Sequence, residues 1–266
     1  MKAIATPQTS YHPLPGFVDI LRSEFRKLLS VRSTYWTLFA AVLFNVGLAA
    51  LVAIVLPSHL TATFDTTRVS LGGLHLSQLA IGVLGVLVIT SEYDTGLIRA
   101  TLSAVPRRRL MLAAKAIVFA VTALIVGIFA SFAAYFVFQA FLSDDSLRSS
   151  IGDPGVLRAV TGGGLYLAVV GLFGLGLGLG AIIRGGAGTI AVLFSVLFVP
   201  PLILELLPRS WRNTIGPYIP FEAGSQIYSL RHDAGSLGPW SGFGVFCLYT
   251  AVTLGAGFVL INRRDA

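Results

Sequence analysis

The sequence predicts an all-α integral membrane protein with six transmembrane helices, an N-terminal amphipathic interfacial helix and both termini in the cytoplasm. Three observations predict this class: hydrophobic residues make up 55% of the 266 residues, charged residues make up only 12%, and the apolar residues fall in long blocks. Soluble domains are about 25% charged and cannot hide this much apolar surface. A disordered chain is excluded because such chains are poor in apolar residues.

Six blocks of 20 to 27 residues contain no Asp, Glu, Lys or Arg. A helix needs about 20 apolar residues to cross the hydrocarbon core, whereas a β-barrel shows alternating segments of about 10 residues. The blocks predict spans at approximately 36–56, 71–90, 116–142, 159–183, 185–207 and 240–261. Residues 17–266 would form one transmembrane domain, preceded by a flexible cytoplasmic tail at 1–16.

The basic residues predict the orientation of these spans. Of the 19 Lys and Arg residues, 13 fall on the side of the two termini and 6 on the other side. Cytoplasmic loops carry the excess of Lys and Arg, so both termini are expected to be cytoplasmic in a multi-pass plasma-membrane protein. The basic excess suits lipid headgroups, and no nucleic-acid partner is expected, because no basic face carries aromatic residues for stacking.

Residues 17–32 predict an amphipathic helix that runs into the first span. Its basic face suits the inner headgroup layer. The apolar face would comprise Phe17, Val18, Leu21, Phe25, Leu28 and Leu29, and the opposite face Asp19, Arg22, Ser23, Arg26, Lys27 and Ser30. We expect Arg22, Phe25, Arg26 and Lys27 to mark this interfacial helix. It either only anchors the chain or also contacts a cytoplasmic partner.

Few polar residues interrupt the spans. Asn45 lies in the middle of the first span and would either line a polar path or bond a neighbouring helix. Pro200 and Pro201 predict a kink or break in the fifth span, and Glu205 follows near its outer end. The fourth span is rich in glycine, which favours close helix packing either within the chain or across a dimer.

Motifs for catalysis and nucleotide binding are missing from the sequence. A P-loop needs a lysine after a glycine-rich turn, and the three lysines, Lys2, Lys27 and Lys115, lie in other contexts. A zinc site of the His-Glu-x-x-His type is also absent from the sequence. We therefore expect no enzyme activity, no metal and no cofactor in this chain. Active transport would need a separate ATPase.

The loop predicted at 91–115 carries a recognisable pattern. It contains Glu92, Tyr93, Gly96, Arg99, Leu102, Pro106, Arg109 and Lys115. This spacing resembles the permease subunits of ABC-2 type ABC transporters in bacteria. The run Pro217–Gly224, within the long outer loop predicted at 208–239, is also similar to many bacterial members. One departure is Leu97, where the family often has Thr.

The resemblance implies a mechanism. Two permease copies, as a homo- or heterodimer, would form the translocation path. Cytoplasmic ATPase subunits would bind beneath them and would hold the ATP and Mg. Residues 92–105 would form a coupling helix that carries Glu92, Tyr93, Gly96, Arg99 and Leu102 and is stopped by Pro106. Glu92 and Arg99 would act by pairing with the ATPase or with the interfacial helix. Candidates for the path are Asn45, Pro200, Pro201 and Glu205.

Two other functions stay open at the level of sequence. The chain is alternatively a non-transporting membrane partner, such as an immunity or sensor subunit. It is alternatively an ion-coupled secondary transporter, although no span carries the paired deep carboxylates of an ion-coupled pump. The exported cargo is not indicated by any residue pattern.

Overall fold

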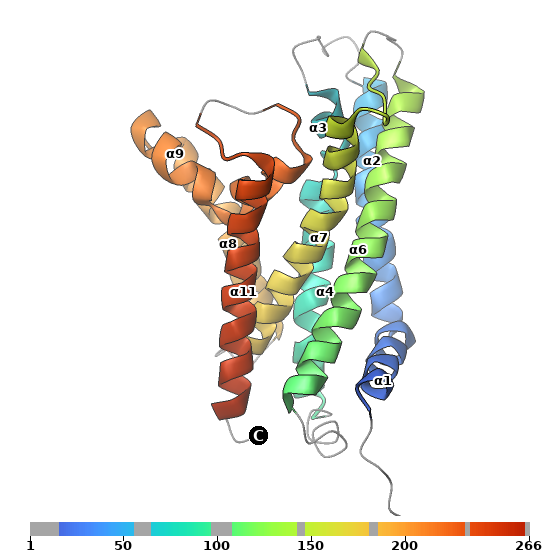
Figure 1. Cartoon of the computed structure of the whole chain (residues 1–266), viewed down its shortest axis with the longest axis vertical. Helices are drawn as coiled ribbons and strands as arrows, with labels where there is room; N and C mark the ends of the chain where they lie inside the picture. The colour runs from blue at the N-terminus through green and yellow to red at the C-terminus, as the bar shows by residue number, and fades with distance from the viewer. Residues whose placement is uncertain are drawn as a thin grey trace, which may run out of the picture.

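The computed structural model describes residues 16–55, 65–96, 108–142, 147–180, 186–231 and 235–263, and every regular element in these ranges is helical. Six of the described helices are long and apolar enough to cross a membrane, and they form one bundle (Figure 1). They are α2 (Arg32–Val55), α4 (Leu74–Asp94), α6 (Arg108–Phe141), α7 (Pro154–Gly180), α8 (Gly186–Leu206) and α11 (Pro239–Arg263). The all-helical, multi-pass character predicted from the sequence is confirmed.

Several helices extend beyond their predicted spans, and two of these extensions enter the same predicted loop. Helix α4 continues to Asp94, and α6 begins at Arg108 rather than at 116, so both enter the loop predicted at 91–115. The early start of α6 has a physical reason, because residues 108–115 are mostly Arg, Leu, Met, Ala and Lys, which favour helix. Met111 and Leu112 are also fully buried against the bundle. The described helices therefore leave a shorter connection between them.

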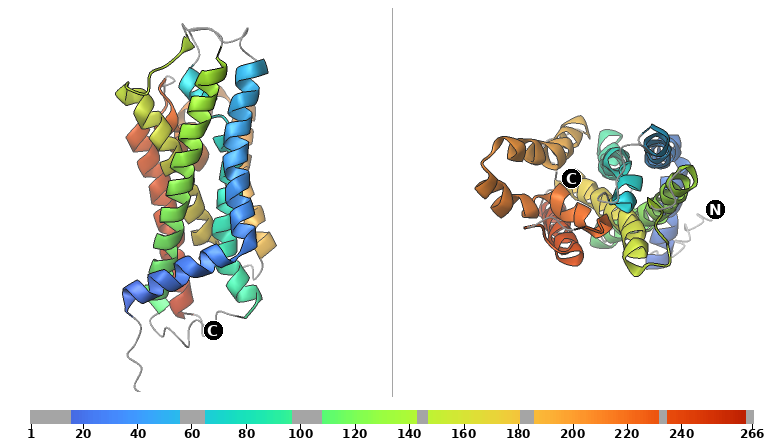
Figure 2. Two further views of the ribbon diagram at one scale, coloured as in Figure 1. Left: turned by 90° about the vertical axis from the view of Figure 1, so that its right-hand side faces the viewer. Right: turned by 90° about the horizontal axis from the view of Figure 1, so that it is seen from above.

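The amphipathic segment forms α1 (Phe17–Ser30), which crosses the end of the bundle obliquely (Figure 2). The Asp19 carboxylate accepts the backbone N–H of Gly16 at 3.2 Å and satisfies one group at the start of the helix. Val31 is extended and interrupts the helical path before α2 begins at Arg32. The predicted helix is present, but a bend at Val31 separates it from the first span.

Helix α7 lies at the centre of the bundle and packs against α4, α6 and α11. Glycines bring α4 and α7 into backbone contact. A Cβ atom added to Gly85 would collide with the carbonyl oxygen of Gly171, and one added to Gly174 would collide with that of Gly82. Small residues permit such close approach of membrane helices. These close contacts of the fourth span lie within the chain.

The opposite end of the bundle carries short helices. The predicted outer loop 208–239 contains α9 (Arg209–Ile215), η3 (Gly216–Tyr218), α10 (Pro220–Ser225) and η4 (Gln226–Tyr228), and α3 (Thr66–Ser70) precedes α4. The Asp65 carboxylate accepts backbone N–H groups from Arg68 at 2.9 Å, Leu230 at 2.7 Å and Arg231 at 3.1 Å. One side chain thus ties the start of α3 to the segment after η4.

Helix α8 continues through Pro200 and Pro201 to Leu206. Of the two predicted alternatives, the break is therefore wrong, and the kink stays a prediction. Each proline removes one backbone donor, and membrane helices tolerate prolines where local adjustment satisfies the freed carbonyls. The two prolines remain as interruptions of the hydrogen-bond ladder in the half of α8 that leads to α9.

Candidate functional site

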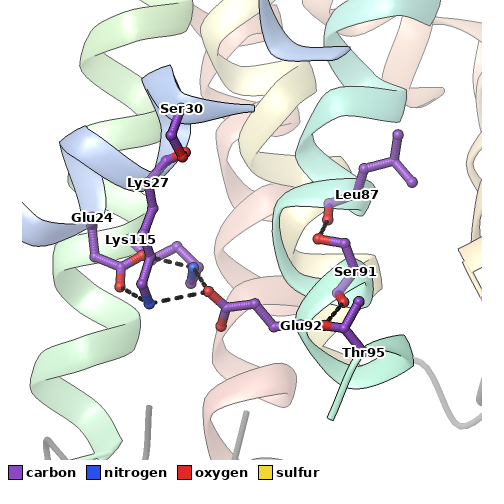
Figure 3. A network of polar contacts seen from close by, with 8 residues as sticks. All are labelled: Glu24, Lys27, Ser30, Leu87, Ser91, Glu92, Thr95 and Lys115. Atoms are coloured by element: carbon purple, nitrogen blue, oxygen red, sulfur yellow. Dashed lines mark hydrogen bonds and ion pairs between the residues drawn. The ribbon is translucent and has the colours of Figure 1, made fainter. Parts of the chain in front are cut away.

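Four charged side chains meet where α1 crosses the ends of α4 and α6 (Figure 3). We call Glu24, Lys27, Glu92 and Lys115 the charged cluster. The Lys115 ammonium lies 2.7 Å from Oε2 of Glu24 and 2.8 Å from Oε1 of Glu92. The Lys27 ammonium lies 2.9 Å from Oε1 of Glu24 and 3.3 Å from Oε1 of Glu92. Two cations and two anions therefore link three helices from distant parts of the chain.

Most of the cluster is withdrawn from solvent. The side chains of Glu24 and Lys115 are 3% and 5% exposed, that of Glu92 is 11% exposed, and that of Lys27 is 44% exposed. Buried charges are tolerated only when they are paired and hydrogen-bonded. The equal number of opposite charges meets this requirement. Removal of one partner would leave its neighbour buried without compensation.

The geometry of α1 explains how Glu24 becomes buried. Ile20, Glu24 and Leu28 recur every four residues and form the face of α1 that packs on the bundle. Phe17, Val18 and Phe25, from the predicted apolar face, are exposed in the single chain. Helix α1 therefore has one face against protein and a second apolar face that is free to contact lipid.

The cluster changes the acid–base behaviour of its two α1 residues. Burial works to raise the pKa of Glu24, but the charge of Lys115 and hydrogen bonds from both lysines outweigh it and hold the pKa below its ordinary value. Burial works to lower the pKa of Lys27, but Glu24 and Glu92 outweigh it and raise the pKa. Each residue is thus stabilised in its charged form.

A cavity of about 460 Å³ lies beside the cluster, in the angle between α1 and α2 and against α4 and α6. We call it the elbow cavity. Its polar lining residues are Glu24, Lys27, Ser30, Ser33, Thr34, Ser91, Glu92, Thr95 and Lys115, and its apolar ones are Leu28, Val31, Leu84, Leu87, Val88, Val118 and Phe119. This volume falls within the range of small-molecule sites.

Of the residues predicted for coupling, Glu92 joins the charged cluster and contacts the interfacial helix through Lys27. Tyr93 is exposed beside it, and Gly96 has a positive φ of 70°, a conformation that favours glycine, where α4 has ended. Arg99, Leu102 and Pro106 lie outside the described residues.

The residues predicted for the interfacial helix lie on α1. Arg22, Phe25 and Arg26 are exposed, whereas Lys27 is half-buried in the charged cluster. Lys27 therefore differs from the other three residues, because its partly exposed side chain also contacts the carboxylates of Glu24 and Glu92.

The residues predicted for the path lie in different environments. Asn45 is fully buried in the single chain against the backbone of Gly73, and neither polar atom of its side chain has a hydrogen-bond partner among the described residues. Glu205 is exposed at the end of α8, and its backbone carbonyl accepts from Arg212 at 2.8 Å. Their role in a path stays a prediction, as does that of Pro200 and Pro201.

Sequence reasoning missed two members of the cluster as site residues. Lys115 was predicted only as part of the loop pattern, and Glu24 was assigned to neither face of the interfacial helix. One signal was available: Glu24 follows Ile20 and precedes Leu28 at helical spacing, so a charge interrupts an apolar stripe.

No protein-family model matches this chain, and no curated protein matches it with significance.

Proposed function

We propose that this chain is the membrane subunit of an ATP-driven ABC exporter in a bacterial plasma membrane, with cytoplasmic termini. Two copies would form the translocation path, and separate ATPase subunits would bind ATP and Mg. The observation that supports this proposal is the charged cluster, because it joins α1, α4 and α6 where α4 leads into residues 97–107. Those residues include Arg99, Leu102 and Pro106 of the pattern that resembles a coupling helix.

The cluster suits the transmission of a displacement. Buried, mutually paired charges resist separation, because parting them exposes uncompensated charge. A push on the end of α4 would therefore move α1 and the start of α6 with it. Helix α4 also contacts the backbone of α7 through Gly82 and Gly85, so the movement would reach the centre of the bundle.

Purification of the tagged chain from native membranes in mild detergent tests the partnership. The proposal expects a stoichiometric ABC-type ATPase in the mass spectrum, lost when residues 96–105 are scrambled in a chain that still folds. A chain that arrives alone and conducts ATP-independent flux in liposomes would support an ion-coupled transporter. A bound partner without ATP-dependent movement would support a sensor or immunity subunit.

The role of Glu92 has its own test within the purified complex. Glu92→Ala is expected to leave the ATPase bound but to remove the response of its hydrolysis rate to the membrane subunit. Asp19→Asn is the matched control, because Asp19 is an exposed carboxylate of α1 outside the cluster and asparagine retains its capping ability. Equal hydrolysis rates in the wild type and Glu92→Ala would contradict the coupling role.

A further inference from the structure

We infer that the elbow cavity binds a phospholipid whose headgroup carries a primary ammonium, drawn from the leaflet at that end of the bundle. The inference depends on the membrane-spanning character of the chain and not on the exporter proposal. Three features support it: the position of the cavity, the direction in which its polarity changes, and the hydrogen-bonding needs of its polar wall.

The cavity lies at one end of the spanning helices, the level at which lipid headgroups are expected. Helix α1 crosses the end of the bundle (Figure 2). Its exposed Phe17 and Phe25 and its basic side chains suit the membrane interface. The elbow at Val31 forms one side of the cavity, and α4 and α6 form the other. An occupant held here would have its polar end near water and its apolar body toward the hydrocarbon core.

The lining changes from polar to apolar in the same direction on two helices. Along α4, Ser91 and Glu92, with Thr95 just after the helix, lie toward the end of the bundle. Val88, Leu87 and Leu84 lie one to two turns deeper. On α6, Lys115 is followed by Val118 and Phe119 one turn deeper. A leaflet has the same gradient from headgroup to acyl chain. A phospholipid therefore matches the cavity in orientation as well as in position.

The charges of the wall favour a zwitterionic headgroup over an anionic one. The charged cluster is neutral as a whole, so an occupant of net charge would have no counter-ion among these four side chains. Lys27 is the most exposed of the four and contributes a positive charge to the wall of the cavity. Oε2 of Glu92 is buried with no hydrogen-bond partner among the described residues. An ammonium could supply the missing donor after a small rotation of this carboxylate.

The hydroxyl groups of the wall reinforce the need for a donor. Ser30 Oγ donates to the Lys27 carbonyl at 2.8 Å, Ser91 Oγ to the Leu87 carbonyl at 2.6 Å, and Thr95 Oγ1 to the Ser91 carbonyl at 2.7 Å. Their hydrogens are thus directed to the backbone, and lone pairs remain for an occupant. A primary ammonium can donate three hydrogen bonds to such a wall, whereas a trimethylated choline headgroup can donate none.

Native mass spectrometry of the purified full chain tests the inference, with phosphatidylethanolamine, its N-methylated forms, phosphatidylcholine and phosphatidylglycerol offered at equal concentration. Retention is expected to fall along the methylation series and to be about tenfold weaker for phosphatidylcholine, the effect of one charge-assisted hydrogen bond. Equal retention of the ethanolamine and choline lipids would overturn the assignment of the headgroup. Preferential retention of phosphatidylglycerol would do the same.

A filled cavity provides the matched variant. Leu87→Trp places a large ring in the elbow cavity, whereas Leu43→Trp places the same ring on an exposed part of α2. Only Leu87→Trp is expected to lose about tenfold in ethanolamine-lipid retention. Equal retention by both variants would overturn the site.

A wild-type measurement keeps the test independent of how these variants fold. A phosphatidylethanolamine with a photoreactive acyl chain is expected to cross-link to residues 84–88 or 118–119. Cross-links confined to other surfaces would place the lipid elsewhere and overturn the inference.

Discussion

The ammonium of Lys115 on α6 lies 2.8 Å from Oε1 of Glu92 on α4, and the same nitrogen lies 2.7 Å from Glu24 on α1. A single cation thus compensates two carboxylates from two other helices. Lys115 is almost fully buried. Without it, water could not solvate the two carboxylates without a large cost in free energy. Lys115 is therefore the member of the charged cluster whose loss we expect to matter most for stability.

We predict that Lys115→Met destabilises the chain by about 3 kcal/mol, the usual cost of breaking a buried ion pair from one side. The measurement is unfolding of the purified protein in mild detergent. Arg109→Met is the control, because Arg109 is an exposed cation on the same helix. The double variant Lys115→Met with Glu92→Gln is expected to lose less than the sum of the single losses. Strict additivity would contradict direct coupling of the pair.

Stability is predicted to depend on pH through the two α1 residues of the cluster. The folded-state pKa of Glu24 lies below its ordinary value of 4.5, so its contribution is complete above pH 4.5 and is lost as pH falls through the lowered pKa. The folded-state pKa of Lys27 lies above 10.5, so its contribution is complete below pH 10.5 and is lost as pH rises through the raised pKa.

The acid side of this profile can be assigned to Glu24 by substitution. Thermal unfolding between pH 3 and pH 7 should show a smaller loss on acidification for Glu24→Gln than for the wild type. Lys115 from α6 contacts both Glu24 and Glu92 from α4. Lys115 and Glu92 are unchanged in Glu24→Gln, so the difference from the wild type reports the Glu24 carboxylate. An unchanged acid slope in Glu24→Gln would contradict the assignment, whereas the unchanged slope is the expectation for the control Asp19→Asn.

The contact between α4 and α7 gives a prediction about packing. Gly174→Ala would drive a Cβ atom into the carbonyl oxygen of Gly82, and the two backbones would have to separate. We expect a loss of about 2 kcal/mol, as for overpacking of a tight core. Gly47→Ala on α2 is the control, because its added Cβ meets nothing within 4 Å beyond the adjoining backbone of its own helix. Equal stability of both variants would contradict the close approach of the helices.

The sequence predicted the helices better than it predicted the site. Length and hydropathy are enough to locate spanning helices, because every membrane-crossing segment must satisfy its backbone internally. Glu92 was found through a family resemblance, and its contact with the interfacial helix was one of two stated alternatives. Glu24 and Lys115 were missed as a pair, because 91 positions separate them and only the packed structure brings α1 onto α6.

The ends of the helices and the face of α1 that packs on protein could not be predicted from the sequence either. The extension of α6 to Arg108 depends on the burial of Met111 and Leu112 against neighbouring helices. Hydrophobicity marks Phe17 and Phe25 as apolar but does not distinguish a face that contacts lipid from one that contacts protein. The protein-facing side of α1 is the one with Glu24, since a partner cation from α6 compensates its burial.

The orientation in the membrane gives the last prediction. In a Cys247→Ser background, which removes the one cysteine of the chain, Ser23→Cys on α1 and Ser210→Cys on α9 place thiols on exposed positions at opposite ends of the bundle. If the excess of Lys and Arg sets cytoplasmic termini, a membrane-impermeant maleimide should label Ser210→Cys in intact cells. It should label Ser23→Cys only after permeabilisation. The reverse pattern would place the charged cluster and residues 97–107 on the outer side, where no cytoplasmic ATPase could reach them, and would overturn the exporter proposal.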